Sequence, residues 1–109
     1  MKNFKIRIWN HDKKVMRYPF GGFFSPVDYK SEEVLLYTGN NDINDRPIFE
    51  NDLIIDYRGT EYTIAFFDGC FYLLVNGLDE DPWLIASQET IDHREMMVIG
   101  NTFEGIFEL

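Results

Sequence analysis

The stretch of residues 37–55, Y-T-G-N-N-D-I-N-D-R-P-I-F-E-N-D-L-I-I, decides the fold of this chain. It begins at the end of one apolar run, residues 34–37, and ends in another, residues 53–55. Between the two runs Gly39 permits a positive φ, and the Asn and Asp side chains after it can bond to their own backbone. The pattern predicts two short strands joined by a dense polar turn.

Short strands are predicted on both sides of this stretch. Residues 4–9 alternate between apolar and polar side chains, which is the period of a half-buried strand, and residues 15–18 can return as its partner. Hairpin-type turns follow at Arg58-Gly59, Asp68-Gly69 and Asn76-Gly77, at short and regular spacing. This spacing favours a small antiparallel barrel or sandwich, so the predicted class is all-β.

The C-terminal part of the chain predicts little helix. Ser87 can cap a single helical turn. A last core strand is predicted at residues 96–99, and Gly100-Asn101 is expected to break it.

Three segments, F-K-I-R-I-W at residues 4–9, the central stretch, and V-I-G-N-T-F-E at residues 98–104, carry a family resemblance. In order and spacing they are similar to K-F-R-A-W, Y-T-G-L-x-D-x-N-G-x-x-I-Y-E-G-D-I-V and V-I-G-N-I-Y-E of the YopX family, which phages and prophages encode. The residues singled out at the matching positions, which we expect to be structural, are Trp9, Tyr37, Thr38, Gly39, Asp42, Glu50, Asp52, Gly100 and Asn101.

The resemblance has two departures and several implications. Asp45 and Asn51 stand where the family usually has Gly, and both residue types tolerate a left-handed backbone, so we expect the turns to survive. The resemblance implies a single domain over residues 1–109 with an SH3-like barrel. N-terminal strands and an aromatic loop are expected at residues 1–33, and the barrel and a C-terminal tail at residues 34–109. It implies no biochemical activity.

Composition restricts the classes of function. The 109 residues carry a formal net charge of -9, which opposes the basic footprint that phosphate contacts need and permits basic partners. Cys70 is the single cysteine, so no internal disulfide can form and a reducing bacterial cytoplasm is expected. The chain opens without an apolar signal segment, and no apolar run approaches membrane-spanning length, so no membrane contact is expected.

Metal and cofactor sites are not predicted. Asn40, Asp42 and Asn44 alternate like the ligands of an EF-hand, but neither possible frame has Gly at its sixth position and Glu at its twelfth. A turn held by bonds from side chains to backbone is therefore expected. His11 and His93 lie far apart in the sequence and lack the spacing of zinc ligands.

Asp52 and Cys70 are the candidate catalytic groups. A carboxylate at the end of a strand can act as an acid or a base, but the sequence identifies no partner for Asp52. We expect its oxygens to accept backbone N–H bonds in the turn. Cys70 has no basic neighbour in the sequence and is expected to be buried and unreactive within a strand. The chain is predicted not to be an enzyme.

Two loops are candidate interaction surfaces. Residues 20–24 form an aromatic, glycine-rich loop that either packs on the core or contacts a partner. Residues 79–83 form an acidic loop that is either a solvated tip or, with a tryptophan as anchor, a contact for a basic surface. The residues proposed for these contacts are Phe20, Phe23, Asp79, Glu80, Asp81 and Trp83. Trp9 is expected to be at least half buried, under a second layer or in an interface.

These features favour a non-enzymatic phage accessory protein that acts through contacts with a host or phage protein. Exposed strand edges and aromatic side chains also predict self-association. One alternative is a nucleic-acid-associated protein that uses the Lys and Arg side chains of residues 2–17, although the net charge opposes it. The other alternative is an acidic mimic of DNA that occupies a host DNA-binding protein.

Overall fold

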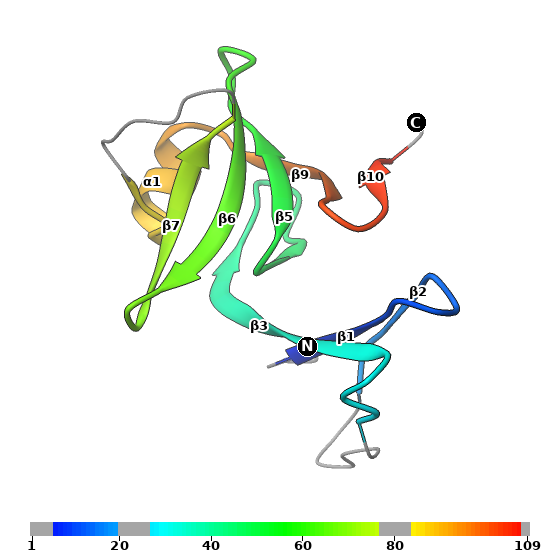
Figure 1. Cartoon of the computed structure of the whole chain (residues 1–109). Coiled ribbons are helices and arrows are strands. Elements are labelled where there is room, and N and C mark those ends of the chain that lie inside the picture. The colour runs from blue at the N-terminus through cyan, green and yellow to red at the C-terminus, as the bar shows by residue number, and fades with distance from the viewer. Residues whose placement is uncertain (1–5, 20–26, 77–83, 108–109) are drawn as a thin grey trace.

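The structure is a computed structural model that describes residues 6–19, 27–76 and 84–107. In these segments two antiparallel sheets and one short helix are formed (Figure 1). The four-stranded sheet has the order β2-β1-β3-β4, and its strands are β1 (Ile6–Asn10), β2 (Val15–Arg17), β3 (Glu32–Asn41) and β4 (Pro47–Phe49). The six-stranded sheet has the order β10-β9-β5-β6-β7-β8, and its strands are β5 (Asp52–Ile55), β6 (Glu61–Phe67), β7 (Cys70–Val75), β8 (Leu84–Ile85), β9 (Met97–Asn101) and β10 (Gly105–Ile106).

The hairpin of β6 and β7 follows its sequence signal. Phe67 pairs with Cys70, so Asp68 and Gly69 alone make the turn. Their φ angles are 52° and 81°, and a type I′ turn needs positive φ at both positions. The predicted all-β, antiparallel class is confirmed, whereas the SH3-like closure of the barrel stays a prediction.

The central stretch differs from its prediction in two respects, of which the first is an additional strand, β4, between β3 and β5. β3 runs from Glu32 to Asn41 rather than over residues 34–37, because its first half pairs with β1 and its far end pairs with Pro47 of β4. A register shift between Tyr37 and Asn41 accommodates the positive φ of Gly39 inside the strand. The polar turn is therefore shorter than predicted and begins at Asp42, and the expected division between residues 33 and 34 falls within β3.

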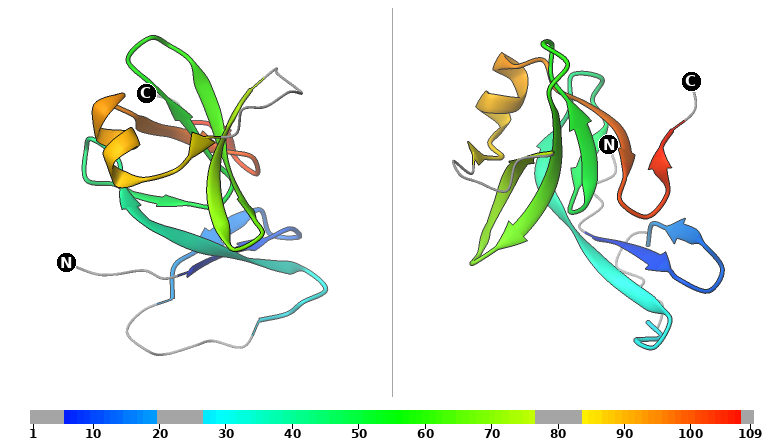
Figure 2. Two further views of the ribbon diagram at one scale, coloured as in Figure 1. Left: turned by 90° about the vertical axis from the view of Figure 1, so that its left-hand side faces the viewer. Right: turned by 45° about the horizontal axis from the view of Figure 1, so that its top comes forward.

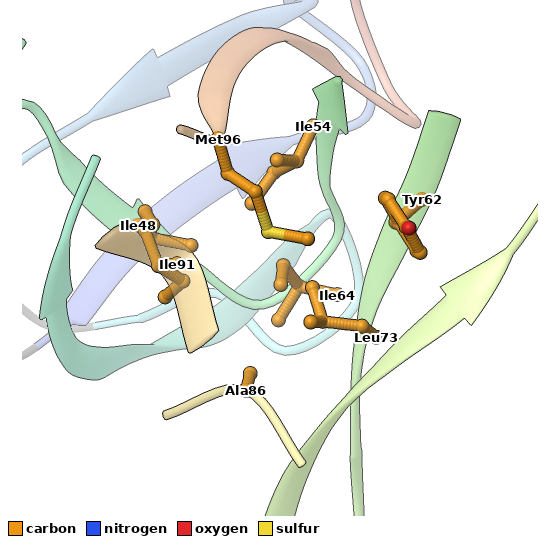
Figure 3. Close-up of a cluster of buried hydrophobic side chains, with 8 residues drawn as sticks. All are labelled: Ile48, Ile54, Tyr62, Ile64, Leu73, Ala86, Ile91 and Met96. Carbon is orange, nitrogen blue, oxygen red and sulfur yellow. The ribbon is translucent and has the colours of Figure 1, made fainter. Parts of the chain in front are cut away.

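The core lies on the concave side of the six-stranded sheet, which the helix α1 (Gln88–His93) and β4 help to cover (Figure 2). Ile48 of β4 and Ile91 of α1 meet the side chains of the sheet, and Met96 points into the middle of the cluster (Figure 3). The buried cluster consists of Ile48, Ile54, Tyr62, Ile64, Leu73, Ala86, Ile91 and Met96. Burying each large apolar side chain contributes about 1.5–3 kcal/mol, so this cluster is the main source of stability.

The C-terminal elements give one confirmed and one wrong prediction. Ser87 caps α1, and its Oγ accepts a hydrogen bond from the backbone N–H of Thr90 at 3.1 Å. Gly100 and Asn101 do not break the last core strand as expected, since both belong to β9 and pair with β5 and β10. A Cβ on Gly100 would overlap the carbonyl oxygen of Gly105, so the glycine is required for the close approach of β10.

Candidate functional site

A buried ion pair joins the two sheets. Arg7 of β1 and Asp52 of β5 are 3% and 1% exposed, and Arg7 Nη2 lies 2.7 Å from Asp52 Oδ1. The same Nη2 donates to the carbonyl of Glu50 at 3.1 Å, and the Arg7 guanidinium lies 4.7 Å from the centre of the Phe49 ring. Asp52 Oδ2 accepts the backbone N–H of Phe49 at 2.7 Å, which confirms the expected bond to its turn.

Burial has the largest influence on the Asp52 carboxyl group. Removing it from water raises its pKa from 3.8 to about 6, although the charge of Arg7, the Phe49 amide and the hydrogen bond from Arg7 act in the opposite direction. Shifted carboxyl pKa values occur at functional sites and also in buried structural ion pairs such as this one. Because the side chain is almost completely buried, Asp52 holds Arg7 in place and cannot meet a substrate directly.

A groove opens above this pair. It has a volume of about 420 Å³ and lies between β1, β2 and the segment that enters β4. Its lining residues are Arg7, Met16, Arg17, Tyr18, Arg46, Pro47 and Phe49. Three cationic side chains therefore share one hollow with aromatic and aliphatic walls, in a chain whose net charge is -9.

Two of the cationic side chains on the first strands, Arg7 and Arg17, are not free for a basic face, because each forms an ion pair. Arg7 is buried against Asp52, and Arg17 Nε donates to Glu32 Oε2 at 3.1 Å. The bonds to Arg17 and to the Asp28 amide lower the pKa of Glu32, so this carboxylate stays charged. Two of the cations in this region are thus neutralised within the chain, which sequence alternation could not reveal.

The family-motif residues of the first polar turn act on the backbone. Asp42 Oδ1 accepts the N–H groups of Asn44 and Arg46, both at 2.9 Å, and its Oδ2 accepts the N–H of Val98 at 2.9 Å. Asp42 thus ties the turn to β9. The expected turn held by bonds from side chains to backbone is confirmed, and Asn40 Nδ2 donates to the carbonyl of Ala86 at 2.7 Å.

Thr38 and Glu50 join β3 to β4 and the residue after it, whereas the Tyr37 hydroxyl bonds within β3. Thr38 Oγ1 donates to the carbonyl of Ile48, and Tyr37 Oη donates to Asn41 Oδ1, both at 2.7 Å. Glu50 Oε1 accepts the N–H of Leu36 at 3.2 Å. Each of these polar groups is used for local structure.

The turn after β9 depends on Asn101. Its Oδ1 accepts the N–H groups of Phe103 and Glu104 at 3.0 and 2.8 Å, and its Nδ2 donates to Glu104 Oε1 at 2.9 Å. The two residues at glycine positions of the family also behave as expected, because Asp45 and Asn51 have φ angles of 62° and 70°.

Trp9 is buried within the chain. It is 3% exposed and stacks on Phe103 with the ring centres 5.2 Å apart, so the prediction that it is at least half buried is confirmed. His11 packs against the same two rings and contacts Glu33 at 3.2 Å, while His93 lines a separate polar hollow beside Asp56. Within residues 6–19, 27–76 and 84–107, no group of three His, Cys, Asp or Glu side chains could hold a metal ion.

The prediction for Cys70 was wrong. Cys70 begins β7, as expected, but its side chain is exposed. It follows directly on the two-residue turn and pairs with Phe67, so it lies at the end of the hairpin and beyond the core. No neighbouring cation was identified from the sequence, so exposure alone does not make it reactive.

An apolar surface on the convex side of the sheet was not predicted. Tyr62, Ile64 and Leu73 point into the core, so the residues between them point outward. We call the apolar members of the outward set the outer apolar face, and they are Ala65, Phe67, Tyr72, Leu74 and Ile85. Phe67 and Ile85 are 58% and 61% exposed. Sequence alternation did not indicate this face, because the outward positions of residues 61–67 also hold Glu61 and Thr63.

Six of the proposed contact residues, in the loops at residues 20–24 and 79–83, lie outside the described residues. They are Phe20, Phe23, Asp79, Glu80, Asp81 and Trp83. In the part of the chain that the structure does describe, no helix is long and apolar enough to cross a membrane.

The fold and its polar turns define a small antiparallel β domain in which the motif residues have structural roles. The family model "YopX protein" matches residues 12–105, and the chain belongs to the YopX family. The crystal structure of protein EF1440 from Enterococcus faecalis is similar, with a TM-score of 0.66 and 23% sequence identity over 92% of this chain and 93% of that chain. This likeness shows a shared fold. A search among curated proteins found no match.

Proposed function

We propose that this protein is a phage or prophage accessory protein that works without catalysis, by binding a basic partner protein in the host cytoplasm. The observation that carries the proposal is the outer apolar face. It places two large apolar side chains, Phe67 and Ile85, on the solvent side of the sheet. Contiguous exposed apolar surface bordered by polar residues is characteristic of protein–protein contacts.

Charge defines the class of partner. Glu61 begins the strand whose outward residues include Ala65 and Phe67, and Asp68 follows at its other end, so carboxylates border the outer apolar face on both sides. Together with the net charge of -9, they favour a partner with a basic rim around apolar pockets. A host DNA-binding protein has such a surface, so the acidic DNA mimic is one form of this proposal.

The non-enzymatic part of the proposal is supported by how the motif side chains are used. The side-chain oxygens of three motif residues accept hydrogen bonds from backbone N–H groups and from Arg7; these residues are Asp42, Asp52 and Asn101. A catalytic acid or base needs to reach the proton of a bound substrate, and these groups face the interior.

The sharpest test compares Ile85→Ser with Ile106→Ser. Both isoleucines are 61% exposed, and they lie in two-residue strands at opposite edges of one sheet. The tagged protein is used to capture partners from nuclease-treated bacterial lysate, and the captured protein is identified and its isoelectric point and affinity are measured. We expect one basic protein whose affinity falls at least tenfold with Ile85→Ser and less than twofold with Ile106→Ser.

Three results would contradict this proposal. Equal effects of the two substitutions would exclude the outer apolar face as the contact. Loss of every partner after nuclease treatment would support association with nucleic acid instead. A dimer in light scattering that Ile85→Ser dissociates would assign the face to self-association.

A further inference from the structure

We propose that the groove lined by Arg7, Arg46 and Tyr18 binds a small organic anion, namely a singly charged carboxylate or phosphodiester attached to a flat ring. The groove lies at the β1–β2 end of the molecule, whereas the outer apolar face lies on β6, β7 and β8 at the other end (Figures 1 and 2). This inference is therefore independent of the proposed partner.

The charge of the groove follows from its ion pairs. Asp52 neutralises Arg7, and Glu32 neutralises Arg17. Among the described residues Arg46 forms no ion pair, and the carboxylate nearest to it in sequence, Asp45, accepts a bond from Asn41 instead. The groove thus carries an excess of about one positive charge, which matches a ligand with a single negative charge.

The Arg46 guanidinium is also positioned. It lies over the ring of Phe107, 4.6 Å from the ring centre, a contact that restricts its rotamers and leaves its planar edge for an oxyanion. Carboxylate and phosphate oxygens bind such an edge through two parallel N–H bonds.

Arg7 supplies the second indication of a ligand. Its side chain is 3% exposed, and its Nε has no hydrogen-bond partner among the residues that the structure describes. A buried donor without a partner destabilises the fold, and a donor on a charged group does so more strongly. Nε itself exposes almost no surface, so a ligand in the groove would be attracted by the charge of Arg7 in the wall while its oxygens contact Arg46.

The remaining walls determine the body of the ligand. Met16, Tyr18 and Pro47 give the groove an apolar lining, and its volume of about 420 Å³ is within the range of sites for small molecules, roughly 300–1,000 Å³. Tyr18 is 38% exposed and its ring packs edge-on against Phe49, so this part of the wall is aromatic and suits an aromatic ligand. A bare inorganic ion would leave this apolar lining uncovered.

The test measures binding of two probes to the full chain at low salt. 2-Naphthoate represents ring carboxylates, and the dinucleoside monophosphate dTpdT represents nucleotide phosphodiesters. Naphthalene-2-carboxamide and thymidine are the uncharged controls. Two-dimensional ¹H–¹⁵N spectra report the environment of the Arg7 Nε–H in one wall of the groove. ¹H–¹³C spectra report the Met16 methyl group in the opposite wall.

The decisive variant is Arg46→Gln, matched by Arg58→Gln. Both arginines are exposed and lie over an aromatic ring, and each substitution removes one positive charge. We expect at least one charged probe to shift the Arg7 Nε–H signal, with an affinity that falls at least tenfold in Arg46→Gln and less than twofold in Arg58→Gln. The probe that binds identifies the source of the anion.

Two results would overturn the inference. The first is that neither charged probe shifts the Arg7 and Met16 signals at millimolar concentration. The second is an equal loss of affinity in Arg46→Gln and Arg58→Gln, because binding would then depend on net charge alone. Circular dichroism of both variants confirms that the fold is intact.

Discussion

Asp52 and Asp56 flank the same short strand, yet their carboxyl groups respond to the protein in opposite ways. Asp52 is 1% exposed and Asp56 is 7% exposed. Burial raises the pKa of Asp52 to about 6. Burial also acts to raise the pKa of Asp56, but bonds from Tyr62 and from the amides of Thr60 and Arg58, with the charge of Arg94, lower it overall.

The difference shows that the number of donors, rather than burial alone, decides the sign of a pKa shift. Asp56 Oδ1 accepts two backbone N–H groups at 2.9 and 3.0 Å, and its Oδ2 accepts the hydroxyl of Tyr62 at 2.8 Å. Asp52 has one backbone N–H and one guanidinium, at a depth that excludes water. Asp56 belongs to a turn at the surface, whereas Asp52 connects two sheets.

The largest expected effect is the difference in stability lost when each of the two carboxyl groups is removed. Asp52→Ala leaves the buried charge of Arg7 without a partner and should cost about 3–5 kcal/mol. Asp56→Ala should cost about 1–3 kcal/mol, because it leaves the Tyr62 hydroxyl and two backbone N–H groups without their acceptor but breaks no ion pair. Urea unfolding at pH 7 measures both, with the exposed Asp12→Ala as control. Equal losses at Asp52 and Asp56 would contradict the comparison.

The second effect is the pH dependence of stability. Between pH 3.8 and about 6 the folded state holds a proton on Asp52 that the unfolded state has released, so stability falls as pH rises. The total fall due to Asp52 is about 3 kcal/mol. The free energy of unfolding of the wild type minus that of Asp52→Asn should decrease by most of this amount from pH 4 to pH 7.

For Asp56 we expect stability to depend on pH in the opposite direction. Its pKa is lowered in the folded state, so its contribution is complete above its ordinary value of 3.8 and is lost as the pH falls below that value. The difference between wild type and Asp56→Asn should be constant above about pH 5 and shrink in acid. Parallel profiles for the two Asn variants would show that burial governs both carboxyl groups.

The smallest effect tests one hydrogen bond. Tyr62→Phe removes the hydroxyl that donates to Asp56 and accepts from Arg94 Nη1 at 3.1 Å. We expect a loss of about 1 kcal/mol and a higher pKa for Asp56, with the pKa of Asp52 unchanged near 6. Carboxyl carbon shifts in an NMR titration measure both values. A shift at Asp52 would show that the two sites are coupled through β5.

Much of the architecture could be predicted from local sequence. The two-residue turn at Asp68-Gly69 and the cap at Ser87 are decided by neighbours within a few residues, and both were found. The left-handed Asp45 and Asn51 were expected from their residue types. The bond from Asp52 to its own turn was also expected, because it spans three residues.

Contacts between segments far apart in the sequence could not be predicted from local sequence. Alternation predicted a half-buried strand at residues 4–9, but Arg7 and Asp52 are 45 positions apart in the sequence, which hides their pairing. The exposure of Cys70 and the extra length of β3 were missed because each depends on which strand lies alongside.

The sequence by itself determined the class of fold, the positions of the tight turns, the acidic character and the family resemblance, because these depend on residue type and short spacing. Only the tertiary structure decided which polar groups are buried together, which strand face is left in solvent, and that three arginines share a groove. The physical reason is that burial and electrostatic pairing depend on distances through space, and chain folding sets these distances between residues far apart in the sequence.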